Sequence, residues 1–94
     1  MTIKTTPFDM SDYLDSPEMI QEYIQTAIED GDPVALRLAL ADVAKAKGMS
    51  NIAADTKLNR QNLYKSLSEN GNPSFNTINK VMKACGLKLQ VANI

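Results

Sequence analysis

The chain has 94 residues, of which 44% are hydrophobic and 22% are charged, values that are ordinary for one small globular domain. No run approaches the roughly 18 apolar residues of a membrane span, and the N-terminus lacks a basic-then-apolar signal pattern. A single cysteine excludes an intramolecular disulfide, so we expect a cytoplasmic protein that is not bound to a membrane.

Charge is unevenly distributed along the chain. Residues 1–32 hold eight acids and one base, a net charge of -7, whereas residues 33–94 hold nine bases and three acids, a net charge of +6. This asymmetry indicates either two surfaces with different partners or two halves that attract each other in the folded protein. Charge alone does not decide between these interpretations.

The N-terminal third predicts an arm followed by a helix. Residues 1–14 show no sustained period, so we predict an extended arm there. Three side chains are expected to anchor it: Phe8, Tyr13 and Leu14. The first helix begins after Ser16, a good N-cap, with Pro17 at the first helical position, and it ends at Gly31. Its apolar stripe has helical spacing: Ile20, Tyr23, Ile24, Ala27 and Ile28.

Two further helices are predicted in the middle of the chain. Asp32-Pro33 repeats the cap-and-proline signal of a helix over residues 33–47, which Gly48 ends. Its inward residues are Leu36, Leu40, Val43 and Ala44. A short third helix runs from Ser50, as N-cap, to near Thr56. Its inward residues are Ile52 and Ala53.

The last two helices are also marked by their caps. After a tight turn at Lys57-Leu58, Asn59 caps a fourth helix that we predict to reach about Ser68. The letters ENGNP form a loop of turn-forming residues, and Ser74 caps a fifth helix that ends before Gly86. The apolar positions of this helix are Phe75, Ile78, Val81, Met82 and Cys85.

The tail over residues 87–94 changes period. Apolar residues alternate with polar or small ones, which predicts a short strand with one apolar face. Because this strand has no partner in its own chain, we expect it to pair with the same strand of a second copy in a two-fold homodimer. The predicted fold is therefore all-α over residues 15–86, with a short C-terminal β-strand.

The third and fourth helices, residues 50–68, match the spacing of a helix-turn-helix. In that motif the first helix crosses the DNA backbone and the second enters the major groove by its N-terminal end. Three leucines fix the pair to the core: Leu58, Leu63 and Leu67. No carboxylate lies between Asp55 and Glu69, which is unusual for a merely solvated helix. A solvated polar face remains the alternative.

Polar residues of this segment are candidates for DNA contacts. Arg60 can pair with guanine, Gln61 can pair with adenine, and Lys65 lies one turn beyond Gln61. Arg60 projects near the apolar side of the helix, so it must reach forward to touch DNA. The remaining candidates lie where the phosphate backbone is expected to run or at the starts of helices: Ser50, Lys57, Asn59, Asn62, Ser66, Asn76 and Thr77.

Other residues give little support to catalysis. The chain has no histidine, and Cys85 lies on an apolar helix face, so it is expected to be a buried packing residue. The acid pairs Asp12/Asp15 and Glu29/Asp30 are interpreted as solvated acids or as a docking surface. We therefore expect no enzyme, no cofactor and no metal.

The stretch LYKSLSENGNPSF is the most specific part of a family resemblance that covers residues 7–91. The chain resembles the bacterial addiction-module antidote proteins, a HigA-like, phage-repressor-like helix-turn-helix branch of antitoxins. The resemblance implies a five-helix repressor-like fold and a dimer that binds its own operator and represses its operon. It also implies a small basic toxin of the RelE/HigB-like ribonuclease class, neutralised by direct binding.

Carried onto this chain, the family motif gives operator-reading roles to Arg60, Gln61 and Lys65. The acidic helix is then the candidate toxin-docking surface, through Glu18, Glu22, Glu29 and Asp30. Lys57 stands where the family usually has the turn glycine, so a non-glycine residue must adopt a positive φ at a cost of about 1 kcal/mol. Cys85 replaces an aliphatic residue. Two alternatives stay open: a plain phage-type repressor without a toxin, and a toxin-binding module with weak DNA binding.

Overall fold

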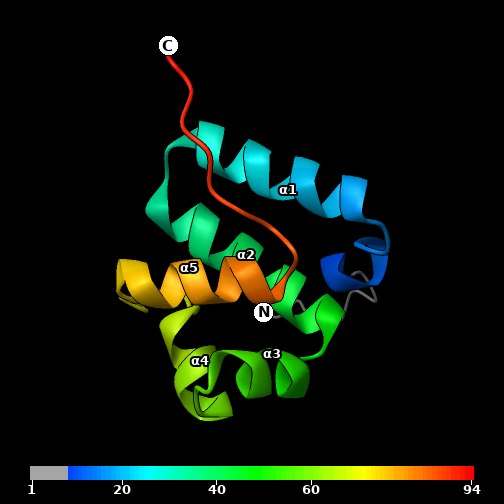
Figure 1. Ribbon diagram of the computed structural model, residues 1–94, viewed down its shortest axis with the longest axis vertical. Coiled ribbons are helices and arrows are strands. Elements are labelled where there is room, and N and C mark those ends of the chain that lie inside the picture. The colour runs from blue at the N-terminus through cyan, green and yellow to red at the C-terminus, as the bar shows by residue number, and fades with distance from the viewer. Residues whose placement is uncertain (1–8) are drawn as a thin grey trace, which may run out of the picture.

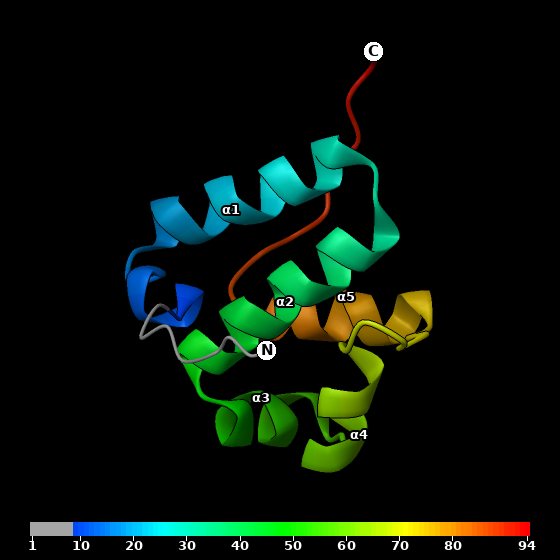
Figure 2. The same ribbon diagram turned by 180° about the vertical axis from the view of Figure 1, so that it is seen from behind.

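The computed structural model describes residues 9–94, and their regular structure is helical (Figure 1). The elements are η2 (Met10–Tyr13, a 3-10 helix), α1 (Pro17–Asp30), α2 (Pro33–Lys47), α3 (Met49–Thr56), α4 (Arg60–Ser66) and α5 (Phe75–Ala84). Both views place α1 at one end of the molecule, α3 and α4 at the other, and α2 and α5 between them (Figures 1 and 2). The prediction of a helical fold is confirmed.

The helix ends follow the predicted caps. The Ser16 hydroxyl accepts a hydrogen bond from the Met19 amide at 3.1 Å, and an Asp32 carboxylate oxygen accepts one from the Val34 amide at 2.9 Å. Gly31 closes α1 with φ 77°, a conformation that glycine adopts without a steric penalty. The Ser74 hydroxyl accepts a hydrogen bond from the Thr77 amide at 3.1 Å at the start of α5. Each cap satisfies amides that lack a partner within the helix.

Three boundaries differ from the prediction. Residues 10–13 form a 3-10 helix rather than extended chain, and Leu14 is buried behind it, whereas Tyr13 is half exposed. Phe8 lies outside the described residues. Helix α3 begins at Met49, one residue before the predicted cap, and α4 ends at Ser66 instead of about Ser68.

The predicted C-terminal strand is not confirmed. Residues 87–94 carry no regular secondary structure, and no strand forms anywhere in residues 9–94. The tail passes beside α1 and leaves the molecule past it (Figures 1 and 2). Leu89 and Val91 are exposed. Strand formation needs a hydrogen-bonding neighbour, which the described part of one chain does not offer to this segment, so pairing with a second copy stays a prediction.

The core gathers apolar side chains from all five α-helices and the residues that flank them. Its most deeply buried members are Leu40, Val43, Ile52, Leu63, Leu67 and Val81. They come from α2, α3, α4, the residue after α4, and α5, so the core joins the α3–α4 pair to the rest of the fold. Two predicted stripe residues instead face solvent: Ile28 near the end of α1 and Phe75 at the start of α5.

Polar contacts tie the layers together. The Tyr23 hydroxyl donates a hydrogen bond to Asp42 at 2.6 Å, which links α1 to α2. Burial, together with this bond, raises the pKa of the Tyr23 phenol above its ordinary value. The Arg37 guanidinium of α2 donates to the carbonyl oxygens of Ser68 at 3.2 Å and Glu69 at 2.9 Å. These bonds hold the loop after α4 against α2.

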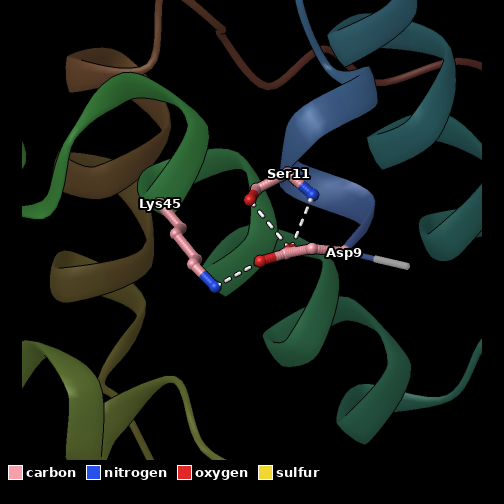
Figure 3. Close-up of polar contacts among 3 residues, drawn as sticks. All are labelled: Asp9, Ser11 and Lys45. Atoms are coloured by element: carbon pink, nitrogen blue, oxygen red, sulfur yellow. Dashed lines mark hydrogen bonds and ion pairs between the residues drawn. The ribbon is translucent and has the colours of Figure 1, made fainter. Parts of the chain in front are cut away.

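A further tie joins the segment before η2 to the end of α2 (Figure 3). Lys45 and Asp9 form an ion pair with a distance of 2.5 Å between Nζ and Oδ2, and the amide and hydroxyl of Ser11 both donate to the Asp9 carboxylate. The Lys45 bond, followed by those from Ser11, lowers the pKa of Asp9 to about 2. The carboxylate therefore stays charged until the pH falls through about 2.

Within residues 9–94, every helix is too short or too polar to cross a lipid bilayer.

Candidate nucleic-acid interface

The candidate interface is built on α3, the three residues Lys57 to Asn59, and α4. The turn depends on Lys57, which adopts φ 61° and ψ 28°, the left-handed conformation that the family resemblance implied for it. Amides of the turn bond back to α3: that of Lys57 to the Ala54 carbonyl at 3.3 Å, and that of Leu58 to the Ala53 carbonyl at 3.1 Å. These bonds close α3 and start the chain toward α4.

Two side chains fix the start of α4. The Asn59 amide oxygen accepts hydrogen bonds from the backbone amides of Gln61 at 2.7 Å and Asn62 at 3.2 Å, so Asn59 is the predicted N-cap. Leu63 is fully buried. The cap and the buried leucine together set how far α4 is rotated about its axis, and therefore which residues face away from the protein.

The polar side chains of this unit face solvent. Lys57, Asn59, Arg60, Gln61, Asn62 and Lys65 are exposed, and Ser66 is half-buried. A helix turns about 100° per residue, so Gln61 and Lys65 lie opposite the side of α4 that buries Leu63. Arg60 lies on one flank of this face and Asn62 on the other. The face is basic and free of carboxylates, and none of the residues 9–94 covers it.

Arg60 is exposed but does not stand alone. Its guanidinium carbon lies over the Tyr64 ring, 5.9 Å from the ring centroid. Tyr64 is 50% exposed on the same flank of α4 and was not among the predicted site residues. Its spacing of four residues from Arg60 is the sequence signal that could have found it, because side chains four apart on a helix are neighbours.

The predicted capping role of Ser50 is wrong. Gly48, with φ 99° and no side-chain cap, precedes α3, and Ser50 is an exposed second residue of that helix. The helix starts early because Met49 is buried and packs into the core as its first residue. The Ser50 hydroxyl remains exposed at the start of α3, on the helix that would cross a DNA backbone.

Asn76 and Thr77 belong to a different element. Both lie in the first turn of α5, between the two ends of the molecule in Figure 1, rather than on the α3–α4 pair. The Thr77 hydroxyl lies 3.1 Å from that of Ser74, so it is engaged in the cap of α5, whereas Asn76 is exposed. These two residues therefore lie on another helix than the turn and α4.

The acidic residues lie at the opposite end from α4. Glu18, Glu22, Glu29 and Asp30 are all exposed on α1. The three glutamates border one shallow groove on the outer side of this helix, whereas Asp30 borders another beside α2. Among residues 9–94, the Asp9–Lys45 pair is the one ion pair that joins the acidic segment to the basic one. Direct ion pairing between the two halves is therefore limited to this one contact in the described part of the chain.

Residues that could serve other chemistry are not assembled into a site. Residues 9–94 contain no cluster of three or more histidine, cysteine, aspartate or glutamate side chains that could hold a metal ion. Cys85 is 3% exposed, and burial raises the pKa of its thiol to about 11. A buried thiol with this pKa is a poor nucleophile, consistent with a packing residue.

Replacing Lys57 with glycine should increase the free energy of unfolding by up to about 1 kcal/mol, because glycine adopts positive φ without steric strain. Urea denaturation measures the change. Lys57→Ala is the matched control, since it removes the same charge and keeps the strain, so it should bring no such gain. A glycine variant no more stable than the alanine variant would contradict the assignment of strain to this turn.

Comparison with known proteins assigns nearly the whole chain to one family. Residues 4–93 match the family described as "probable addiction module antidote protein". A relative from Haemophilus influenzae (strain KW20 / Rd), described as an uncharacterized protein, is 43% identical over 91 residues, which cover 97% of this chain and 94% of the relative. No solved structure matches. The match over nearly all residues shows that the chain belongs to the addiction-module antidote family.

Proposed function

We propose that this protein is the antitoxin of a type II toxin–antitoxin module. In this proposal a homodimer binds operator DNA through a helix-turn-helix formed by α3 and α4, represses its own operon, and neutralises a RelE/HigB-like toxin by direct contact. Family membership supports the antitoxin role, since an antidote implies a toxin. DNA binding rests on the geometry of α4.

The observation that carries the DNA-binding proposal is the exposed, carboxylate-free face of α4. Gln61 and Lys65 face away from the core, and Arg60 extends the face along one flank. Side chains of these types pair with base edges in the major groove or with phosphates. Lys57 adds a cation at the turn, where a DNA backbone would pass. In a dimer, two such helices would lie about 34 Å apart on a palindromic site.

The acidic outer side of α1 supports a second partner. Glu18 and Glu22 are one helical turn apart, and Glu29 lies two turns beyond Glu22 on the same side. A row of exposed carboxylates attracts a basic protein by long-range electrostatics and orients it before contact. Because this row and the α4 face lie at opposite ends of the molecule, the proposed DNA and toxin surfaces do not overlap (Figure 1).

A gel-shift experiment tests the proposal. The purified protein is titrated against the DNA upstream of its own gene, with and without the product of the neighbouring reading frame. A specific shift, together with a complex between the two proteins, is expected. Operator binding without a neighbouring toxin would favour a plain phage-type repressor, whereas toxin binding without a specific shift would leave only a toxin-binding module.

Reversing charge on α1 should weaken toxin binding. The double variant Glu22→Lys/Glu29→Lys is expected to lose affinity for the toxin by about tenfold or more, because it places like charges opposite a basic partner. Isothermal titration calorimetry measures the affinity. The control is Asp55→Lys/Glu69→Lys, which changes net charge equally, with one site on α3 and the other in the loop after α4. Equal affinities for the two variants would remove α1 as the docking surface.

A further inference from the structure

The contact between Arg60 and Tyr64 is a feature of α4 that general DNA binding does not require. The two residues are four apart on one helix, and the guanidinium carbon lies 5.9 Å from the centre of the phenol ring. That distance is within the range of about 6 Å in which a cation over an aromatic face is attracted to it. Both side chains are exposed, so neither is placed there by core packing.

The ring is also the contact that orients the guanidinium. Within residues 9–94, the Arg60 side chain forms no ion pair or hydrogen bond, and the segment from Thr56 to Ser68 has no carboxylate to attract it. An unrestrained arginine on a helix surface samples many rotamers, and immobilising such a side chain on binding costs entropy. The Tyr64 ring reduces this cost because it already favours one orientation.

The contact with the ring leaves the hydrogen-bonding capacity of the guanidinium unused, since the attraction is between its charge and the ring. The five N–H donors of arginine are then free to bond another partner, because an aromatic face attracts the cation without accepting an ordinary hydrogen bond from it. An arginine held in this way keeps the forked edge that pairs with O6 and N7 of guanine. Arg60 lies near the apolar side of α4 by sequence position. The contact with Tyr64, which is itself exposed, instead directs it toward the exposed flank of the helix.

We propose that Tyr64 is a positioning residue for Arg60, which it holds ready to read a guanine at the edge of the operator half-site. This inference rests on the proposed function, since it assumes that α4 meets DNA. Tyr64 acts through its aromatic face and not through its hydroxyl. Phenylalanine should therefore replace it, whereas aliphatic residues should not.

Operator affinity in a double-mutant cycle tests the inference. Tyr64→Ala is expected to weaken operator binding about two- to fivefold, the size of an exposed cation–aromatic contact. Tyr64→Phe should bind like the unmodified protein. Adding Tyr64→Ala to Arg60→Ala should cause no further loss, and both single variants should lose discrimination at the same G·C pair. Thermal unfolding of each variant separates these effects from instability.

A measurement without DNA keeps the inference independently falsifiable. In NMR spectra of the free protein, the ring should shift the Arg60 side-chain protons upfield, and Tyr64→Ala should abolish that shift. Three results would each overturn the positioning role. The first is the absence of an upfield shift in the free protein. The others are a loss of operator affinity from Tyr64→Ala that is the same with and without Arg60, and a Tyr64→Phe variant that loses operator affinity. If Gln61→Ala still changes operator binding in that case, the proposed function stands; if the protein binds no duplex, both fall.

Discussion

Replacing Gly71 with alanine should destabilise the protein by about 3 kcal/mol, the upper end of the cost of forcing extra atoms into a packed site. A Cβ atom on Gly71 would lie 2.0 Å from the Ser66 carbonyl oxygen and 2.6 Å from that of Lys65. Both contacts are with backbone, so no side-chain rotation relieves them. The loop or the end of α4 must move.

The loop around Gly71 has little freedom to move. The Gly71 amide donates a hydrogen bond to the Ser68 carbonyl at 3.0 Å, and Arg37 bonds the carbonyl oxygens of Ser68 and Glu69 from α2. Relieving the clash therefore breaks hydrogen bonds or displaces the last turn of α4. Because Lys65 lies in that turn, we also expect those molecules of the variant that remain folded to bind the operator more weakly.

Thermal unfolding measures the effect, since about 3 kcal/mol corresponds to a fall in Tm of roughly 12–24 °C in a domain of this size. Gly31→Ala is the matched control. Gly31 has φ 77° and open space around its added Cβ, so alanine there costs only the left-handed conformation, about 1 kcal/mol. A Gly71→Ala protein as stable as the Gly31→Ala protein would contradict the packing of this loop.

The sequence predicted those parts of the fold that depend on local chemistry. Ser16, Asn59 and Ser74 form side-chain caps at their helices, as their identities and positions indicated. Helical spacing identified every buried residue of α1 and α5, but in α2 it missed buried Ala39 and included Leu36, which is only partly buried. Capping and periodicity involve residues a few positions apart, so they can be read without knowledge of the rest of the chain.

The predictions that were wrong or unconfirmed concern features that depend on contacts between residues far apart in the chain. Helix α3 starts at Met49 because its side chain enters the core, which overrides the better capping chemistry of Ser50. Ile28 and Phe75 keep the helical period but are 39% and 71% exposed, because periodicity does not show how far neighbouring elements cover a residue. A tail with alternating apolar residues becomes a strand only beside another strand, and this information is not in a single chain.

For the candidate site, too, some features could be predicted from the sequence and others depend on distant packing. The exposure of Gln61 and Lys65 followed from the helical period, whereas the positive φ of Lys57 was implied by the family resemblance, which has a glycine at this position. Tyr64 was not among the predicted site residues, and whether it pairs with Arg60 depends on side-chain rotamers, which the sequence does not give. The separation of acidic α1 from basic α4 could not be predicted, since it depends on how the helices pack in three dimensions (Figure 1).

Gln61→Ala should weaken operator binding by about 1–3 kcal/mol and relax specificity at one base pair. Gln61 is exposed on the side of α4 opposite Leu63, and its backbone amide is bonded to Asn59. The side-chain amide is therefore available for adenine, to which it can donate and from which it can accept a hydrogen bond. Removing it leaves the base edge without these partners.

Lys57→Ala is the comparison that separates base reading from general attraction to DNA. As a phosphate contact, Lys57 should contribute equally to every sequence, so its loss should weaken all duplexes alike and reduce the salt slope by about 1. Fluorescence anisotropy with the operator, single-base variants and unrelated duplexes at several salt concentrations measures both effects. Gln61→Ala should change the ranking of the base variants and leave the salt slope unchanged. If it leaves that ranking intact, Gln61 does not face a base, and the assignment of Arg60 and Lys65 on the same helix fails with it.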